Sequence, residues 1–337
     1  MDMSAELTDQ TGLAPSSYQK TGRKKTKVHS DTVLAWIFSL VPLLGFVLFS
    51  VFPIIISGIA MFTDMDIYAF ESFKWNAYEG FRLVFDADYS ALQTVDVHSL
   101  FMHSIGITVW IASAQLITLA IALVISVCLA QKMKGSKLLQ VLFFMPNVIS
   151  GVAIAIMWVW IYDKDGGILN TILGTQKDWL HTESTITWCI IVAIIWQAPA
   201  YGIVMFRSAF ANVDNALYEA ADLDGANLWN KTIHVTIPSI MPTIFYLLMA
   251  GVGAGLLTYD MSALLVSDGF STADVGGTGH AGLTMMRLIY YLMSDNVMAD
   301  RYSYMSAAAI IAWVLFFATA ILSIIVYRIR ERQLKND

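Results

Sequence analysis

The residues best placed to do chemistry form one polar stretch between two long apolar runs. It reads Tyr218-Glu219-Ala220-Ala221-Asp222-Leu223-Asp224-Gly225-Ala226. The segment from Glu219 to Leu223 is rich in helix formers, and Gly225 can adopt the positive φ that ends such a helix. Near the start of a short helix, the Glu219 carboxylate is stabilised by the helix dipole and can bind an arginine of a partner.

A second short helix is expected directly after this stretch. Residues 227–235 place Leu228, Trp229 and Ile233 at roughly helical spacing, and Pro238 is expected to end the helix. The sequence therefore predicts a helix, a glycine turn and a second helix.

Each remaining residue of the motif has a role that follows from its type. Gly225 sets the angle between the two helices, and the Asp224 side chain can form a hydrogen bond to the backbone of the turn. Ala220 and Ala221 are small enough for that face of the helix to enter a groove, and Ala226 completes the motif. These residues predict a docking surface.

Polar residues also occur inside the apolar runs. Asp260 follows Tyr259 near the end of one run, and Gln197 lies within another. A charge inside a membrane span is costly, so Asp260 is a functional candidate. The alternative is that Asp260 only caps its helix or bridges to a neighbouring one, and the same choice applies to Gln197.

Catalytic and metal-binding motifs are absent from the sequence. It has no Gly-x-x-x-x-Gly-Lys-Ser/Thr loop to hold nucleotide phosphates, no nucleophile elbow and no His-Glu-x-x-His helix. The six histidines form no pair at metal-ligand spacing. We therefore expect no enzyme, no metal site and no cofactor in this chain, and its work must be done through partners.

The elements that position these residues are membrane-spanning helices. The 337 residues are 57% hydrophobic and 14% charged, against about 25% charge in soluble domains. Several apolar runs reach the roughly 20 residues that cross a bilayer, and they lack the alternation of barrel strands. The predicted fold is an all-α integral membrane protein with six spans and a helix–turn–helix coupling loop on the cytoplasmic side. The expected segments are a tail 1–33, spans 34–62, 100–130, 138–162, 185–206, 242–266 and 304–327, extracytoplasmic segments 63–99 and 267–303, a cytoplasmic loop 207–241 and a tail 328–337.

The distribution of positive charge predicts the orientation. If both termini and the polar loop are cytoplasmic, 14 of the 20 basic residues lie inside. Because basic residues favour the cytoplasmic side, we expect a multi-pass membrane protein with both termini inside.

The polar loop resembles the EAA loop of binding-protein-dependent ABC transporter permeases. Glu-Ala-Ala, two residues, Asp-Gly-Ala and then Ile237-Pro238 agree with that family in type, spacing and position. The resemblance implies that the loop docks into a groove of an ATPase subunit, with Glu219 as the docking acid. Two positions depart from the family pattern: Thr232 stands where an aromatic is usual, and Asp214 stands where a proline often precedes the motif.

Further motifs resemble the carbohydrate branch of this family, the type I importers. They are Phe143-Phe144-Met145-Pro146, Trp158-Val159-Trp160, Gly167 with Asn170, and Thr258-Tyr259-Asp260. In related transporters the translocation path passes the fifth span, so Gln197, Tyr259 and Asp260 could meet sugar hydroxyls. The family's Asn-Thr pair is absent, since the chain has His103-Ser104-Ile105 there.

The resemblance implies a permease that imports a carbohydrate, such as an oligosaccharide, by alternating access. Its expected partners are ABC ATPase subunits that bind ATP and Mg²⁺, a second homologous permease forming a heterodimer, an extracytoplasmic solute-binding protein, the sugar and membrane lipid, with no nucleic acid. The alternative is an ion-coupled secondary transporter or channel with Asp260 as its relay. That class needs no coupling loop and usually shows internal repeats or further intramembrane charges.

Overall fold

The structure is a computed structural model that describes residues 28–63, 75, 78–130, 135–266, 275–294 and 301–334. Most of the expected N-terminal tail, the basic turn at 131–134, parts of both extracytoplasmic segments and the last three residues lie outside the described residues. The chain divides into two units, residues 1–55 and 56–337, and each is described by itself.

The first unit is helical throughout its described part. Helix α1 (Val28–Phe46) passes into a π-helical turn, η1 (Val47–Val51), and then into α2 (Phe52–Ala60), whose last residues belong to the second unit. Residues 38–60 are long and apolar enough to span a membrane. Pro53 follows the π turn closely, and the wider turn accommodates a proline that would strain a regular α-helix.

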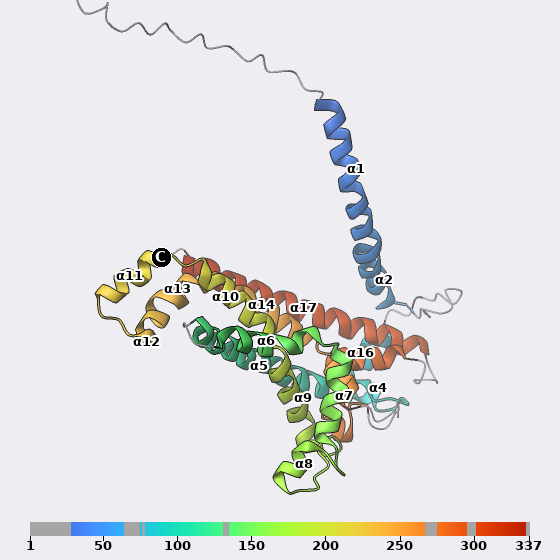
Figure 1. Cartoon of the computed structure of the whole chain (residues 1–337). Helices are drawn as coiled ribbons and strands as arrows, with labels where there is room; N and C mark the ends of the chain where they lie inside the picture. Colours follow the sequence, from blue (N-terminus) through green and yellow to red (C-terminus); the bar gives the residue numbers. More distant parts are fainter. Residues whose placement is uncertain are drawn as a thin grey trace, which may run out of the picture. The chain divides into compact units, whose positions relative to one another are not determined.

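The second unit is a helical bundle (Figure 1). Its helices are α3 (Glu79–Phe85), α4 (Ala87–Ser90), α5 (Val97–Ala130), α6 (Ser136–Val148), α7 (Gly151–Tyr162), α8 (Ile168–Leu173), α9 (Glu183–Gln197), α10 (Pro199–Ala211), α11 (Asn215–Leu223), α12 (Leu228–Lys231), η2 (Thr232–Thr236), α13 (Ile237–Ser239), α14 (Met241–Leu256), α15 (Asp260–Leu265), η3 (Thr278–His280), α16 (Met285–Met293) and α17 (Arg301–Leu334).

The expected all-α membrane fold is confirmed. In the described residues, five helical segments are long and apolar enough to cross a membrane, and a bent pair brings the number up to six. That pair corrects one expectation, since 138–162 is not a single straight span. Helices α6 and α7 meet at an angle of 100°. The backbone is extended at Ile149 and Ser150, so the helical hydrogen bonds stop there.

Helix α5 is the centre of the bundle. Its buried residues belong to three apolar clusters: one with α3, α16 and α17, one with α7, α9 and α15, and one with α10 and α14. Small residues allow the closest packing. A Cβ added at Gly255 would lie 2.8 Å from the Cα of Ala112, and one at Gly202 would lie 2.9 Å from the Cβ of Ala122. Gly255 therefore allows α14 and α5 to approach closely.

Asn170 organises the loop after α7. Its buried amide donates hydrogen bonds to the carbonyls of Asp163, Lys164 and Lys177, at 2.8–3.2 Å. Its Oδ1 accepts from the Nε1 of Trp179 at 2.8 Å. The Gly-x-x-Asn motif found in the sequence thus has a structural role, because one side chain satisfies the backbone of a whole loop.

Candidate coupling loop and translocation path

The first coupling helix, α11, begins at Asn215, four residues earlier than the sequence suggested. Asp214 caps it, because its Oδ1 accepts a hydrogen bond from the backbone N–H of Ala216 at 2.9 Å. Aspartate therefore provides the helix start at a position where the family often has proline. Glu219 lies in the middle of α11, not near its start, so the helix dipole gives its exposed carboxylate little stabilisation.

The turn after α11 is a Schellman motif. The N–H of Ala226 donates to the carbonyl of Ala221 at 2.9 Å, and the N–H of Gly225 donates to that of Asp222 at 3.1 Å. Gly225 has φ +73°, which confirms the positive φ predicted for it. The backbone N–H of Asp224 donates to Ala220 at 3.1 Å, so Asp224 belongs to the cap through its main chain.

The helical part of the second half of the loop is longer than predicted. Asn227 caps α12 by accepting from the N–H of Asn230 at 2.9 Å. The chain then stays helical through η2 and α13 to Ser239, so Pro238 does not end it. The N–H of Ile237 donates to the carbonyl of Thr232, five residues back, and this π turn opens the helix before the proline.

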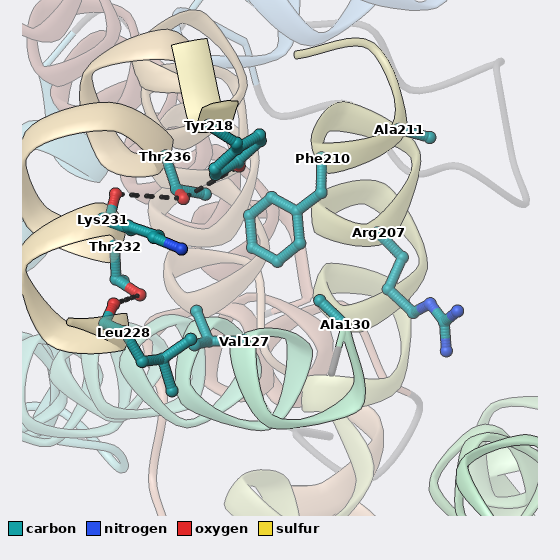
Figure 2. Close-up of a pocket in the computed structure, with 10 residues that line it drawn as sticks. All are labelled: Val127, Ala130, Arg207, Phe210, Ala211, Tyr218, Leu228, Lys231, Thr232 and Thr236. Atoms are coloured by element: carbon teal, nitrogen blue, oxygen red, sulfur yellow. Dashed lines mark hydrogen bonds between the residues drawn. The ribbon is translucent and has the colours of Figure 1, made fainter. Parts of the chain in front are cut away.

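Two side-chain contacts fix the angle between the halves of the loop. The hydroxyls of Tyr218 and Thr236 lie 2.9 Å apart and are hydrogen-bonded, as Figure 2 shows. Lys231 forms an ion pair with Asp222 of α11. Together with the glycine turn, these contacts make the loop a unit that can transmit force as one body.

A cavity of about 430 Å³ separates this unit from the ends of two spans (Figure 2). Val127 and Ala130 of α5 and Phe210 of α10 form its apolar side, opposite Tyr218 and Thr232 of the loop. Thr232 is buried, and its Oγ1 donates to the carbonyl of Leu228 at 2.9 Å. The small side chain at this position, where the family usually has an aromatic, leaves the cavity space unfilled.

The outer surface of the loop carries both polar and apolar side chains. Glu219 and Ala220 are exposed, and Ala221 is partly exposed. Leu223 is 91% exposed and Trp229 is 71% exposed, which is unusual for large apolar side chains. Leu223 was not among the residues expected to form the docking surface.

Tyr259 and Asp260 lie at a break in a spanning helix, whereas Gln197 lies at a one-residue turn within a continuous span. Gln197 is the last residue of α9, where the chain passes into α10. Tyr259 lies between α14 and α15, and Asp260 is the first residue of α15. Asp260 is exposed and has no hydrogen-bond or ion-pair partner among the described residues, so it neither caps nor bridges there. Broken helices in membrane proteins commonly line a cavity, because their free backbone groups need polar surroundings.

The break in the fifth span has neighbours at the start of α16 and within it. The Tyr290 ring lies against that of Tyr259, with 4.9 Å between ring centroids. Thr284 donates through its Oγ1 to the carbonyl of Thr258 at 2.8 Å. Arg287 donates to the carbonyls at the end of α15, Ser262 at 2.7 Å and Val266 at 2.6 Å. The segment 284–290 therefore holds both ends of α15 in place.

Comparisons with known proteins agree with this architecture. Residues 119–335 match the family described as "Binding-protein-dependent transport system inner membrane component". The chain is 27% identical to the probable ABC transporter permease protein YesP of Bacillus subtilis, over 91% of this chain and 93% of the relative. It is 26% identical to the multiple sugar-binding transport system permease protein MsmF of Streptococcus mutans, over 86% and 93%.

A solved structure shares the fold. It is a bacterial ABC transporter involved in the import of the acidic polysaccharide alginate, with a TM-score of 0.68 and 22% identity, covering 90% of this chain and 96% of that one. The family match covers more than half of the chain. This protein therefore belongs to the family of inner membrane components of binding-protein-dependent transport systems.

Proposed function

We propose that this chain is the permease subunit of an ATP-driven importer of carbohydrate, in which it forms part of the translocation path by alternating access. Two observations support the cargo class: the sugar-permease motifs of the sequence and the similarity to MsmF. In this scheme the chain itself is not an enzyme. ATP and Mg²⁺ bind to a partner ATPase, and a solute-binding protein delivers the sugar from outside.

The coupling loop carries this proposal. A rigid helix–turn–helix with exposed Leu223, Trp229 and Glu219 has the form of a plug for a groove on another protein. In our scheme Glu219, Ala220, Ala221, Asp224, Gly225 and Ala226 form the docking element for the ATPase. Motion of the ATPase would then reach the spans through α10 on one side of the loop and α13–α14 on the other.

The path would be completed by a second homologous permease. Gln197, Tyr259 and Asp260 carry groups that hydrogen-bond sugar hydroxyls or stack on a sugar ring, and Tyr259 and Asp260 lie at a helix break. The distribution of basic residues supports a cytoplasmic position for both termini and the coupling loop, and the family match supports a prokaryotic cell membrane.

Reconstitution tests the proposal. Vesicles containing this chain, its ATPase and second permease, with the binding protein outside, should take up an oligosaccharide only when ATP is supplied on the ATPase side. An uncoupler should have no effect, and an ATPase subunit without its catalytic carboxylate should abolish uptake. Uptake that proceeds without ATP and collapses with the uncoupler would instead indicate an ion-coupled transporter.

A further inference from the structure

A second cavity lies at the opposite end of the fourth span from the coupling loop. Its volume is about 440 Å³, and it is lined by His103 and Ile107 of α5, Thr182, Glu183 and Ser184 at the start of α9, and Gly279 of the turn before α16. Helix α5 has 34 residues, whereas about 20 cross a bilayer, so its ends project beyond the hydrocarbon. The cavity therefore opens on the extracytoplasmic side in the proposed orientation.

A strained, rigid turn forms one wall of this cavity. His280 is the one non-glycine residue with positive φ in the described part of the chain, at +57°. Residues in this conformation persist only where the surroundings fix them. Here Thr278 donates to the carbonyl of His181 at 2.9 Å, and Thr187 of α9 donates to that of Ala281 at 2.6 Å. The turn is thus tied by hydrogen bonds to α9 at one end and to the residues just before α9 at the other.

The turn brings polar groups from three parts of the chain together. A Cβ added at Gly279 would lie 2.5 Å from the carboxyl carbon of Glu183, so the turn lies directly against that side chain. The ring of His280 lies edge-on to the ring of His103, with 6.1 Å between centroids. Glu183, His103 and Ser184 are exposed, so their polar atoms are accessible to a ligand.

Two exposed tryptophans lie further along the same two helices, outside the lining of the cavity. Trp110 lies two turns after His103 on α5, and Trp188 lies one turn after Ser184 on α9. Their rings meet edge to face at 5.4 Å, and their exposed fractions are 46% and 54%. Carboxylate, imidazole and hydroxyl groups can bind the hydroxyls of a sugar ring, and an indole ring can pack against its C–H face.

We propose that this cavity is an outer binding site for an uncharged saccharide, which it receives before the path at Tyr259 and Asp260. The site rests on the proposed function in one respect, that the cargo is a carbohydrate. Glu183 accepts hydrogen bonds from sugar hydroxyls, and the described lining contains no lysine or arginine. A uronate carboxylate would therefore meet a like charge with no compensating cation. The site should thus favour neutral saccharides, unlike the alginate importer, whose cargo is acidic.

Direct binding to the assembled transporter tests the site. The transporter is placed in nanodiscs without the binding protein, and saturation-transfer NMR is recorded with maltotriose, cellotriose, xylotriose and trigalacturonate. A neutral trisaccharide that supports uptake should give transfer signals, and trigalacturonate should give none. Glu183→Gln should weaken binding about tenfold, the size expected for one lost charged hydrogen bond. Asp165→Asn, an exposed carboxylate of the neighbouring loop, is the matched control and should change nothing.

The outcomes distinguish failure of the outer site from failure of the proposed function. If none of these saccharides is taken up by the reconstituted importer, the proposed function fails. If one is taken up, but its binding is the same in wild type, Glu183→Gln and His103→Ala, the outer site is wrong. The site is also wrong if Glu183→Gln weakens only the affinity for the binding protein, because the cavity would then receive a protein side chain. Ser184→Ala, a milder change, should weaken saccharide binding in a correctly folded protein.

Discussion

Replacement of Gly225 by alanine should impair coupling without damage to the rest of the protein. Gly225 has φ +73°, and no atom lies within 4 Å of the position its Cβ would take. The substitution therefore adds no steric clash. Its cost is the backbone strain of a left-handed L-residue alone, about 1–2 kcal/mol.

This strain is comparable to the contacts that hold the loop closed. The hydrogen bond between Tyr218 and Thr236 contributes about 1 kcal/mol, and the partly exposed pair of Lys231 and Asp222 contributes at most about 1 kcal/mol. A strain of 1–2 kcal/mol shifts a two-state equilibrium by about 5- to 30-fold. We therefore expect uptake to fall several-fold with Gly225→Ala and to be lost when Tyr218→Phe is added.

Gly174 provides a matched control. It ends α8 with φ +64°, and its Cβ position is also free of neighbours within 4 Å. Gly174→Ala should therefore cost the same backbone energy and lower the melting temperature equally, but leave uptake unchanged. The assay is ATP-driven uptake in vesicles alongside thermal unfolding of the purified complex.

Gly225→Asn gives a second check, because asparagine tolerates the left-handed conformation better than alanine and should restore part of the uptake. Equal uptake by the Gly225→Ala and Gly174→Ala variants would refute the reasoning. The turn geometry would then be irrelevant to coupling, whatever its place in the fold.

Three further predictions follow from the loop, the path and the charge distribution. Glu219→Lys should lower uptake about tenfold or more while the protein still inserts, because the substitution reverses the charge at the contact with the ATPase. Co-purification of the ATPase measures the loss of this contact, and undiminished co-purification would contradict the prediction. Asp260→Asn should change the half-saturating sugar concentration moderately and leave ATP dependence intact; loss of all uptake together with a new sensitivity to uncoupler would contradict it. In a cysteine-free background, a membrane-impermeant thiol reagent should label Asp88→Cys from outside but not Ser136→Cys, and the reverse result would invert the topology.

Local chemistry explains what could be predicted from the sequence. Membrane spans follow from the length of apolar runs, and the turn at Gly225 follows from the one residue type that adopts positive φ without strain. The helix break at Tyr259 lies next to Asp260, a residue already selected because a charge inside a membrane span is costly. In each case the signal lies within a few residues of the feature.

Features that depend on distant residues could not be predicted in this way. The outer cavity joins His103, Glu183 and Gly279, which are far apart in the chain, and no local pattern places them together. The bend after Val148, by contrast, does have local signals, Pro146 and the Ser150-Gly151 pair, but the length of the apolar run 138–162 was interpreted as one span. The position of Glu219 within α11 was missed because the cap, Asp214, precedes the recognisable motif.

Proline shows how a sound local rule can give the wrong boundary. Both described π turns end two residues before a proline, Pro53 in the first span and Pro238 in the coupling loop. In a regular α-helix the proline ring would clash with the carbonyl four residues back, and that carbonyl would lose its donor. The π turn bonds one residue further back, from Ile237 to Thr232, and the helix continues. The loop is therefore joined to α14 by nearly continuous helix. In the proposed scheme, this connection would carry a displacement at the docking surface to the fifth span and to the break before Asp260.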